Sequence, residues 1–207
     1  MTSSAGAVGA VLALCLLGAS QGARAGAQLE EPLADKVRSA MAASVADSAP
    51  PRPSFDSIDD RLDYLRWLGT MSERLKRRKS EHLTRVEFLE ALWYESKRAG
   101  LEPALVLGLI QVESGYRKYA ISSAGARGYM QVMPFWARSI GRGDPNQLFH
   151  MQTNLRFGCT ILRHYLARES GDMTMALGRY NGSRGRPEYP NAVFASQRQW
   201  VYKPTAA

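Results

Sequence analysis

The amino-acid sequence predicts a mainly α-helical domain over residues 58–202. Three observations predict it. Apolar residues recur at spacings of three and four over most of this range, as they do on the buried face of a helix. No stretch alternates apolar and polar residues in the way that a half-buried strand does. Residues suited to helix starts and ends fall between the apolar segments, as Pro103 and Gly100 do. With 207 residues, 45% of them hydrophobic, the chain is long enough for one domain with a substantial core plus appendages.

Residues 1–25 are predicted to be a signal peptide. Residues 5–18 are small and apolar, and Ala23-Arg24-Ala25 fits a small-x-small cleavage site. The apolar run is too short for an ordinary membrane-spanning helix, and no Lys or Arg precedes it. We therefore expect export to the periplasm of a bacterial envelope, with no stable transmembrane segment after cleavage. An uncleaved N-terminal anchor is the alternative.

Residues 26–57 are rich in Ala, Ser and Pro and are predicted to be a low-complexity linker segment. Within it, Leu33, Val37, Met41 and Val45 recur every four residues, which predicts a small amphipathic helix. The run Ala49-Pro50-Pro51-Arg52-Pro53 then breaks any helix. We expect this segment to tether the domain or to contact an envelope-spanning machine.

Residues 58–88 are predicted to be a helical extension at the start of the domain. Helical spacing joins the apolar residues Ile58, Leu62, Leu65, Leu68, Met71 and Leu75. The basic run 76–79 is expected to be a solvated helix end, which the helix dipole favours. Thr84-Arg85-Val86-Glu87 has the pattern of a capping box and predicts the start of the next helix. That helix is expected to turn Val86, Leu89, Leu92 and Trp93 inward and to end at Gly100.

A short central helix is predicted over residues 103–113. Apolar residues cover nearly every side of it from Ala104 to Val112, which is typical of a buried helix. It ends at Glu113, and both burial and the negative end of the helix dipole raise the pKa of a carboxyl group there. A glutamic acid that stays protonated near neutral pH suits a general acid. The alternative is a glutamate that turns outward into water.

The remaining segments continue the helical pattern. Residues 118–128 are predicted to be a loop, Pro134 to begin a helix, and Asp144-Pro145 to cap the next. Leu155, Cys159, Leu162 and Leu166 predict a longer helix that ends at residue 168. A further helical segment is predicted after Gly171-Asp172. It is followed by a loop at 181–187 and by a last helix that begins at Pro190.

Charge and composition narrow the function classes. Removing residues 1–25 removes one Arg from 27 basic residues and leaves 19 acidic ones, so 26 minus 19 gives +7. A basic chain favours an acidic partner, and export favours a cell-envelope polymer over nucleic acid. Cys159 is then the one cysteine left, so no internal disulfide is expected. His82, His150 and His164 lack ligand spacing, and no phosphate-binding glycine pattern is present, so neither a metal nor a cofactor is predicted.

An ordered set of motifs resembles a known family. It comprises Glu113-Ser114, then Gly128-Tyr129-Met130-Gln131-Val132-Met133-Pro134, then Tyr180-Asn181-x-Ser183, and then Tyr189. In this order the motifs resemble those of the soluble lytic transglycosylase (SLT) domain, family 1 of the lytic murein transglycosylases, which is related to goose-type lysozyme. The resemblance covers roughly half of the chain, from about Leu89 to Trp200. Tyr129, Arg179 and Ser183 depart from the residues usual in the family.

The resemblance implies a compact lysozyme-like helical domain and an enzyme without a cofactor. Such domains cleave the β-1,4 bond between N-acetylmuramic acid (MurNAc) and N-acetylglucosamine (GlcNAc) in peptidoglycan and form 1,6-anhydro-MurNAc ends. Glu113 would be the catalytic acid and then the base. The other motif residues would bind substrate or hold the site: Ser114, Met130, Gln131, Tyr180, Asn181 and Tyr189.

Two other functions compete with this reading. A goose-type lysozyme-like muramidase would use water in place of the sugar hydroxyl and would need a second carboxylate. Asp144, Asp172 and Glu188 are candidates, although Asp144 and Asp172 fit helix caps better. A non-catalytic peptidoglycan-binding or scaffold protein is the third possibility, and the intact set of motifs argues against it.

Overall fold

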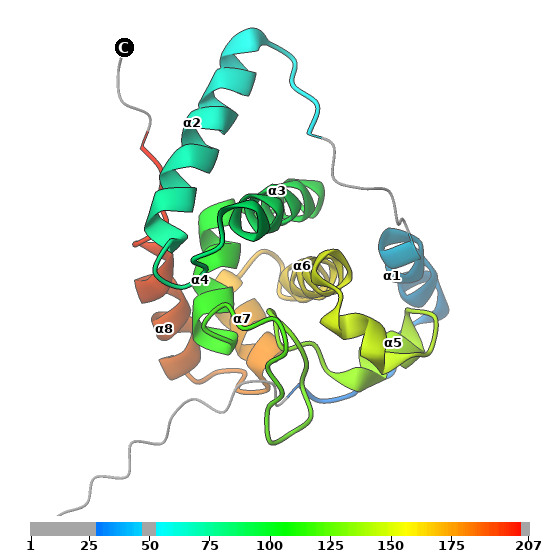
Figure 1. Cartoon of the computed structure of the whole chain (residues 1–207). Helices are drawn as coiled ribbons and strands as arrows, with labels where there is room; N and C mark the ends of the chain where they lie inside the picture. Colours follow the sequence, from blue (N-terminus) through cyan, green and yellow to red (C-terminus); the bar gives the residue numbers. More distant parts are fainter. Residues whose placement is uncertain (1–27, 47–52, 204–207) are drawn as a thin grey trace, which may run out of the picture.

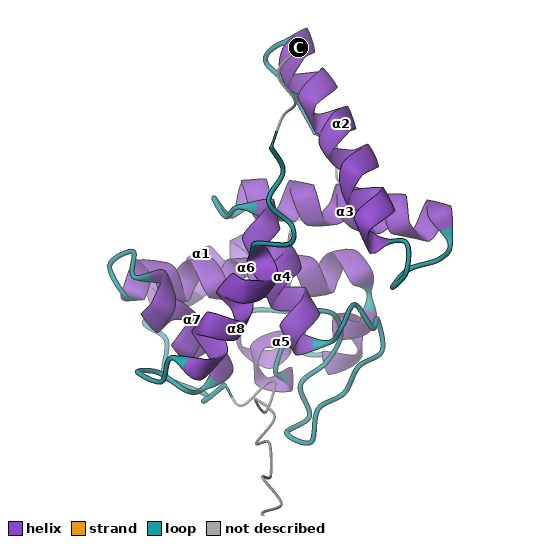
Figure 2. Ribbon diagram, turned by 90° about the vertical axis from the view of Figure 1, so that its left-hand side faces the viewer, coloured by secondary structure: helices purple, strands orange, loops and turns teal. Residues whose placement is uncertain are grey.

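The computed structural model describes residues 28–46 and 53–203, and this part of the chain is helical (Figures 1 and 2). Its elements are α1 (Asp35–Ala46), α2 (Ile58–Leu75), α3 (His82–Arg98), α4 (Pro103–Glu113), α5 (Pro134–Ser139), the 3-10 helix η1 (Pro145–Phe149), α6 (Met151–Arg168), α7 (Met173–Asn181) and α8 (Glu188–Gln197). Within the described residues, β-pairing is limited to the isolated bridges of Arg127 with Ile121 and Val132. The predicted mainly α fold is confirmed.

Helix α4 lies in the middle of the domain, with α3 and α8 packed against it (Figure 1). It is buried on nearly all sides, as its continuous apolar sequence predicts. Gly108 brings it close to α8, since a Cβ atom there would lie 2.6 Å from the backbone nitrogen of Gln197. The central helix is therefore a fixed base for the residue at its end, Glu113.

A buried ion pair joins α3 to α6. Glu95 accepts hydrogen bonds from Arg156 Nε at 3.0 Å and from Arg98 Nε at 2.9 Å, and its side chain is fully buried. Arg98 also donates to the backbone oxygen of Ser44 at 2.9 Å, which links this pair to the end of α1. The arrangement ties three helices together around one carboxylate.

The first half of α2 does not bury the apolar residues that helical spacing joins. Ile58, Leu62 and Leu65 are 78%, 41% and 48% exposed, whereas Tyr64 and Trp67 of the same helix are buried. This half of α2 projects beyond the body of the domain (Figure 2). The aromatic side of α2 is the side that packs against the domain. The ring centroid of Tyr64 lies 5.1 Å from that of Phe55 and 4.8 Å from that of Trp93.

Two helix starts also differ from the prediction. Helix α3 begins at His82, because the side chain of Glu81 accepts from the backbone nitrogens of Leu83 and Thr84 and caps the helix. Helix α8 begins at Glu188, two residues before the predicted start, so Tyr189 lies inside its first turn. The predicted caps are confirmed, since Asp144 and Asp172 accept from backbone N–H groups of the following turns.

The small amphipathic helix predicted near the N-terminus is confirmed as α1. It packs against α6, with Met41 buried in the contact. The predicted signal peptide, residues 1–25, lies outside the described residues, and so does most of the predicted helix break at 49–53. Within the described ranges, each helix is too short or too polar to cross a membrane.

Candidate functional site

The end of α4 places Glu113 inside the domain. Glu113 is only 6% exposed, so the alternative of a glutamate turned outward into water is wrong. The hydroxyl of Tyr189, from the first turn of α8, donates a hydrogen bond to Glu113 Oε1. The second carboxyl oxygen, Oε2, is buried and has no hydrogen-bond partner among the described residues. One oxygen is therefore held in place and the other is left unpaired.

Burial raises the pKa of Glu113 to about 8, and the hydrogen bond from Tyr189 opposes this shift only in part. Removing water disfavours the charged carboxylate, whereas a donated hydrogen bond favours it. At neutral pH the group therefore carries a proton in the folded chain. This is the direction that the buried sequence context of Glu113 predicts.

The residue that follows Glu113 orders the neighbouring loop. Ser114 is buried, and its hydroxyl donates to the backbone oxygen of Tyr129 at 2.7 Å. A second contact of the same hydroxyl reaches the oxygen of Ile110 at 3.2 Å. Of the two roles expected for Ser114, substrate binding or loop ordering, these contacts perform the second.

The motif 128–134 forms a tight turn against α6. Gly128 has a φ of 76°, and a Cβ atom there would lie 2.4 Å from Asn154 Nδ2. Gln131 adopts a φ of 48° and donates from Nε2 to the backbone oxygens of Gly128 at 2.9 Å and Ala120 at 3.1 Å. The side chain of Gln131 is thus engaged in holding the loop that begins after Glu113.

Met130 lies deeper than the resemblance suggests. Its side chain is fully buried against Gly158, where a Cβ atom would come within 2.3 Å of the Met130 sulfur. Met130 and Gln131 were both expected to bind substrate or hold the site, and neither is more than 2% exposed. The structure places both beneath the surface, where they support the loop.

Asn154 is a site residue that the sequence did not reveal. Its Oδ1 accepts from the backbone nitrogen of Met130 at 2.8 Å. Its Nδ2 donates to the oxygens of Arg127 at 2.9 Å and Leu148 at 2.8 Å. Asn154 satisfies the backbone of the motif turn from the side of α6.

The Tyr180-Asn181 pair closes the site from the end of α7. Tyr180 donates to the backbone oxygen of Met130 at 2.8 Å, so it holds the motif turn and not the carboxyl group of Glu113. Burial and the nearby charge of Glu113 raise the pKa of Tyr180 well above its usual value. Asn181 donates from Nδ2 to Ser183 Oγ at 3.0 Å, and its buried Oδ1 is unpaired within the described chain.

The structure thus links several of the predicted residues, since Tyr189 donates to Glu113, Ser114 to the oxygen of Tyr129 and Tyr180 to the oxygen of Met130. Oε2 of Glu113 and Oδ1 of Asn181 are both buried, and neither has a hydrogen-bond partner among the described residues. The three candidates for a second catalytic carboxylate have other roles or positions in the fold. Asp144 and Asp172 cap helices, and Glu188 is exposed at the start of α8.

Comparison with known proteins identifies relatives. The family described as the transglycosylase SLT domain matches residues 91–201. A transglycosylase of Enterobacteria phage PRD1 is 34% identical over 107 residues, which are 50% of this chain and 38% of the phage protein. The membrane-bound lytic murein transglycosylase C of Actinobacillus pleuropneumoniae serotype 5b (strain L20) is 45% identical over 84 residues. Those residues are 37% of this chain and 23% of that relative, so the chain spans well under half of the length of either protein.

Among solved structures, an inactive mutant of the lytic transglycosylase Slt from Pseudomonas aeruginosa is similar, with a TM-score of 0.43 and 24% sequence identity. The similarity covers 70% of this chain and 24% of that chain.

Proposed function

Because this chain belongs to the transglycosylase SLT domain family, we propose that it is a lytic murein transglycosylase that acts on peptidoglycan. The bond cleaved is the MurNAc-β-1,4-GlcNAc bond, and the product carries a 1,6-anhydro-MurNAc end. One observation supports this proposal above the others. Glu113 is buried, has a raised pKa and keeps one carboxyl oxygen unpaired.

In the first step Glu113 acts as general acid. Its proton moves from Oε2 to the oxygen that bridges the two sugars, and the bond between C1 of MurNAc and that oxygen breaks. The GlcNAc side leaves as an alcohol, and C1 develops oxocarbenium character. A pKa of about 8 supports this role, since the group is protonated at the pH of the reaction.

In the second step the ionised Glu113 acts as general base. It takes the proton of the 6-hydroxyl group of the same MurNAc, and O6 forms a bond to C1. The anhydro ring closes and Glu113 regains its proton, so atoms and charge balance without water. One carboxylate is enough for this sequence, unlike the pair that glycosidases usually employ.

The neighbours of Glu113 assist at different stages. Tyr189 donates to Oε1, and this bond strengthens when the carboxylate carries its charge between the two steps. The unpaired Oδ1 of Asn181 is an acceptor for the N–H of the N-acetyl group on MurNAc. Ser114, Met130, Gln131 and Tyr180 contribute by fixing the loops around the substrate, not by touching it.

The proposed location is the periplasm, reached by the predicted signal peptide. The formal charge of +7 that remains after removal of residues 1–25 suits peptidoglycan, whose peptides carry carboxylates. An envelope-spanning machine remains the further partner proposed for the segment at 26–57. Membrane attachment is found in the name of one relative and is not carried over to this chain.

The test is mass spectrometry of the sugars released from purified peptidoglycan. Wild-type protein is expected to release anhydro-muramoyl products, and Glu113→Gln is expected to release none. Reducing hydrated ends would instead identify a muramidase. Binding of glycan without any product, by folded wild-type protein, would identify a binding or scaffold protein.

A further inference from the structure

The segment before α1 does not hang free of the domain. Residues 28–34, here called the N-terminal strap, precede α1 without regular secondary structure and contact α5, α6 and α7. The strap lies outside the part of the chain that the SLT family matches, residues 91–201. Its contacts with the domain are specific, as the side chains of Gln28 and Glu31 show.

Gln28 anchors the first residue of the strap. It is 4% exposed, and its Oε1 accepts a hydrogen bond from Trp136 Nε1 at 2.8 Å. Trp136 is itself buried, in the helix that follows the motif turn 128–134. A polar side chain is rarely buried in a loop without such a partner, so this contact fixes the position of the strap.

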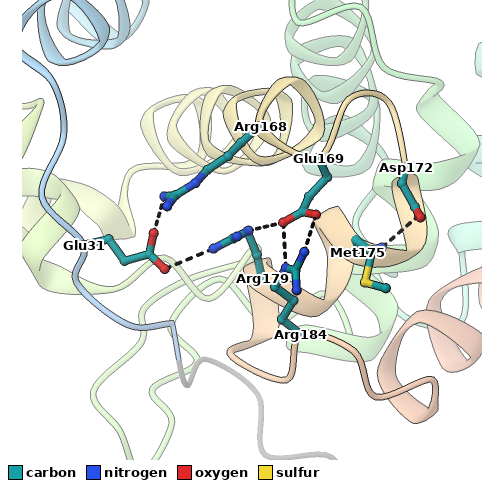
Figure 3. A network of polar contacts seen from close by, with 7 residues as sticks. All are labelled: Glu31, Arg168, Glu169, Asp172, Met175, Arg179 and Arg184. Atoms are coloured by element: carbon teal, nitrogen blue, oxygen red, sulfur yellow. Dashed lines mark hydrogen bonds and ion pairs between the residues drawn. The ribbon is translucent and has the colours of Figure 1, made fainter.

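Glu31 makes the second contact, with two arginines from different helices (Figure 3). Its carboxylate accepts from Arg168 at the end of α6 and from Arg179 Nη1 of α7, the latter at 3.1 Å. Arg179 also donates from Nε to Glu169, which in turn accepts from Arg184 Nε at 2.8 Å and Nη2 at 2.9 Å. The carboxylates of Glu31 and Glu169 thus accept hydrogen bonds from three guanidinium groups in one network.

This network surrounds the turn that carries two site residues. Arg179 directly precedes Tyr180 and Asn181 in the sequence. Beyond them, the backbone nitrogens of Gly182 and Ser183 donate to the oxygens of Arg179 at 3.0 Å and Gly178 at 2.7 Å. Arg184, at the far side of the turn, is held by the same network. Both ends of the turn are therefore fixed by ion pairs.

We propose that Glu31 is a positioning residue of the active site, and that the strap holds in place the end of α7, which carries Tyr180 and Asn181. This inference rests on the proposed function for its catalytic part. Glu31 does not touch the substrate. It balances the charge of Arg179 and Arg168, so Arg179 stays stretched between Glu31 and Glu169 and keeps the end of α7 in one place.

The test compares Glu31→Gln with Glu30→Gln in the full chain. Glu30 is the neighbouring residue, is exposed, and makes no ion pair within the described residues, so its variant removes the same charge without removing the contact. The first readout is hydrogen exchange in residues 178–186, which does not depend on activity. Exchange there is expected to be faster in Glu31→Gln and unchanged in Glu30→Gln.

The second readout is steady-state cleavage of soluble glycan strands, measured well below the melting temperature. We expect Glu31→Gln to lower kcat about threefold to tenfold with a change in KM below about twofold, as for loss of an interaction between neighbouring groups. Glu30→Gln should keep both constants. In a double-mutant cycle, Glu31→Gln should lower kcat less in the Arg179→Met background than in the wild-type background.

The outcomes separate the two claims. Unchanged exchange in Glu31→Gln would overturn the strap contact, whatever the activity. Faster exchange with wild-type kcat and KM would show a purely structural contact and would overturn the positioning role. A wild-type protein without any cleavage activity would overturn the proposed function, and with it the catalytic role of Glu31, while the exchange result would still decide the contact.

Discussion

Tyr189 and Glu113 are 76 residues apart in the sequence, and a hydrogen bond from the tyrosine hydroxyl to Glu113 Oε1 joins them inside the domain. The bond joins the first turn of α8 to the end of α4, two helices that pack against each other. It leaves Oε2 as the unpaired oxygen of the carboxyl group. The packing of two helices thereby decides which oxygen of Glu113 can deliver a proton.

The pH dependence of activity should follow the protonation of Glu113. Its pKa lies at about 8 in the folded chain, and a general acid works only while it holds its proton. We expect kcat/KM to fall by about tenfold per pH unit above that pKa. A pH–rate profile on soluble glycan strands measures this. A limb centred near the ordinary value of 4.5 would contradict the proposed acid role.

The stability of the wild-type protein and of Glu113→Gln should diverge with pH. Between about 4.5 and about 8, the folded chain keeps a proton on Glu113 that the unfolded chain has lost, so rising pH favours unfolding of the wild type. The variant has no titrating group at this position, so it lacks this pH dependence of stability. The free energy of unfolding of the variant minus that of the wild type should rise by about 1.4 kcal/mol per pH unit over this range.

Denaturant unfolding at several pH values measures this difference, and the groups common to both proteins cancel. Above the folded pKa the carboxyl group is ionised in both states, so the difference should level off there. A difference that is constant from pH 5 to pH 8 would mean that Glu113 titrates normally in the folded chain.

Tyr189→Phe removes the donor to Glu113 and keeps the ring. Since the hydrogen bond lowers the pKa of Glu113, its loss should move the alkaline limb of the pH–rate profile to higher pH. Glu113 also loses this hydrogen bond while it is ionised, and a hydrogen bond to a charged group is a strong one. We therefore expect kcat to fall about tenfold to a hundredfold. Tyr94→Phe, at a half-buried tyrosine of α3, is the control and should keep wild-type kinetics.

Gly108→Ala tests the approach of α4 to α8. The added Cβ would lie 2.6 Å from Gln197 N and 2.8 Å from Gln197 Cα, and backbone atoms cannot move aside as a side chain can. We expect a loss of about 1–3 kcal/mol in the free energy of unfolding, together with lower activity, because α8 carries Tyr189. Gly69→Ala is the matched control, in the interior of α2 with nothing within 4 Å. It should stabilise the protein by about 0.5–1 kcal/mol. Equal effects of the two substitutions would contradict this packing argument.

Glu95→Gln breaks the buried ion pair between α3 and α6. It leaves the buried charge of Arg156 without the carboxylate that now faces it, which should cost about 3–5 kcal/mol in chemical unfolding. Glu73→Gln breaks the exposed pair with Lys76 and should change stability by less than about 0.5 kcal/mol. A small effect at Glu95 would show that the neighbourhood of Arg156 is more solvated than the structure has it.

The burial of the helix before Glu113 could be predicted from the sequence, because it is apolar on nearly every side, but the pattern left open whether Glu113 itself turns inward or into water. The buried face of α2 could not be predicted. Its aliphatic residues and its aromatic residues both recur at helical spacing, and only the position of α3 decides which side is covered. Local pattern therefore predicts the helix but not its orientation.

The contacts that complete the site lie beyond the reach of pattern for a different reason. Asn154 resembles a solvated residue in a helical stripe until α6 is packed against the motif turn. Glu31 lies in a segment whose composition predicts a linker, and the ion pairs that it makes are with two arginines more than 130 residues away in the sequence. Charges and amides that pair across the fold are invisible to periodicity, which reads one element at a time.

The measurement that tests the central claim most directly is cleavage of purified peptidoglycan in water enriched in ¹⁸O, with mass spectrometry of the new muramoyl ends. If Glu113 closes the sugar ring with the 6-hydroxyl group, these ends carry no ¹⁸O and have the mass of the anhydro sugar, and Glu113→Gln yields none. Muramoyl ends that are hydrated and labelled with ¹⁸O would show that water attacks C1, and would contradict the single-carboxylate mechanism.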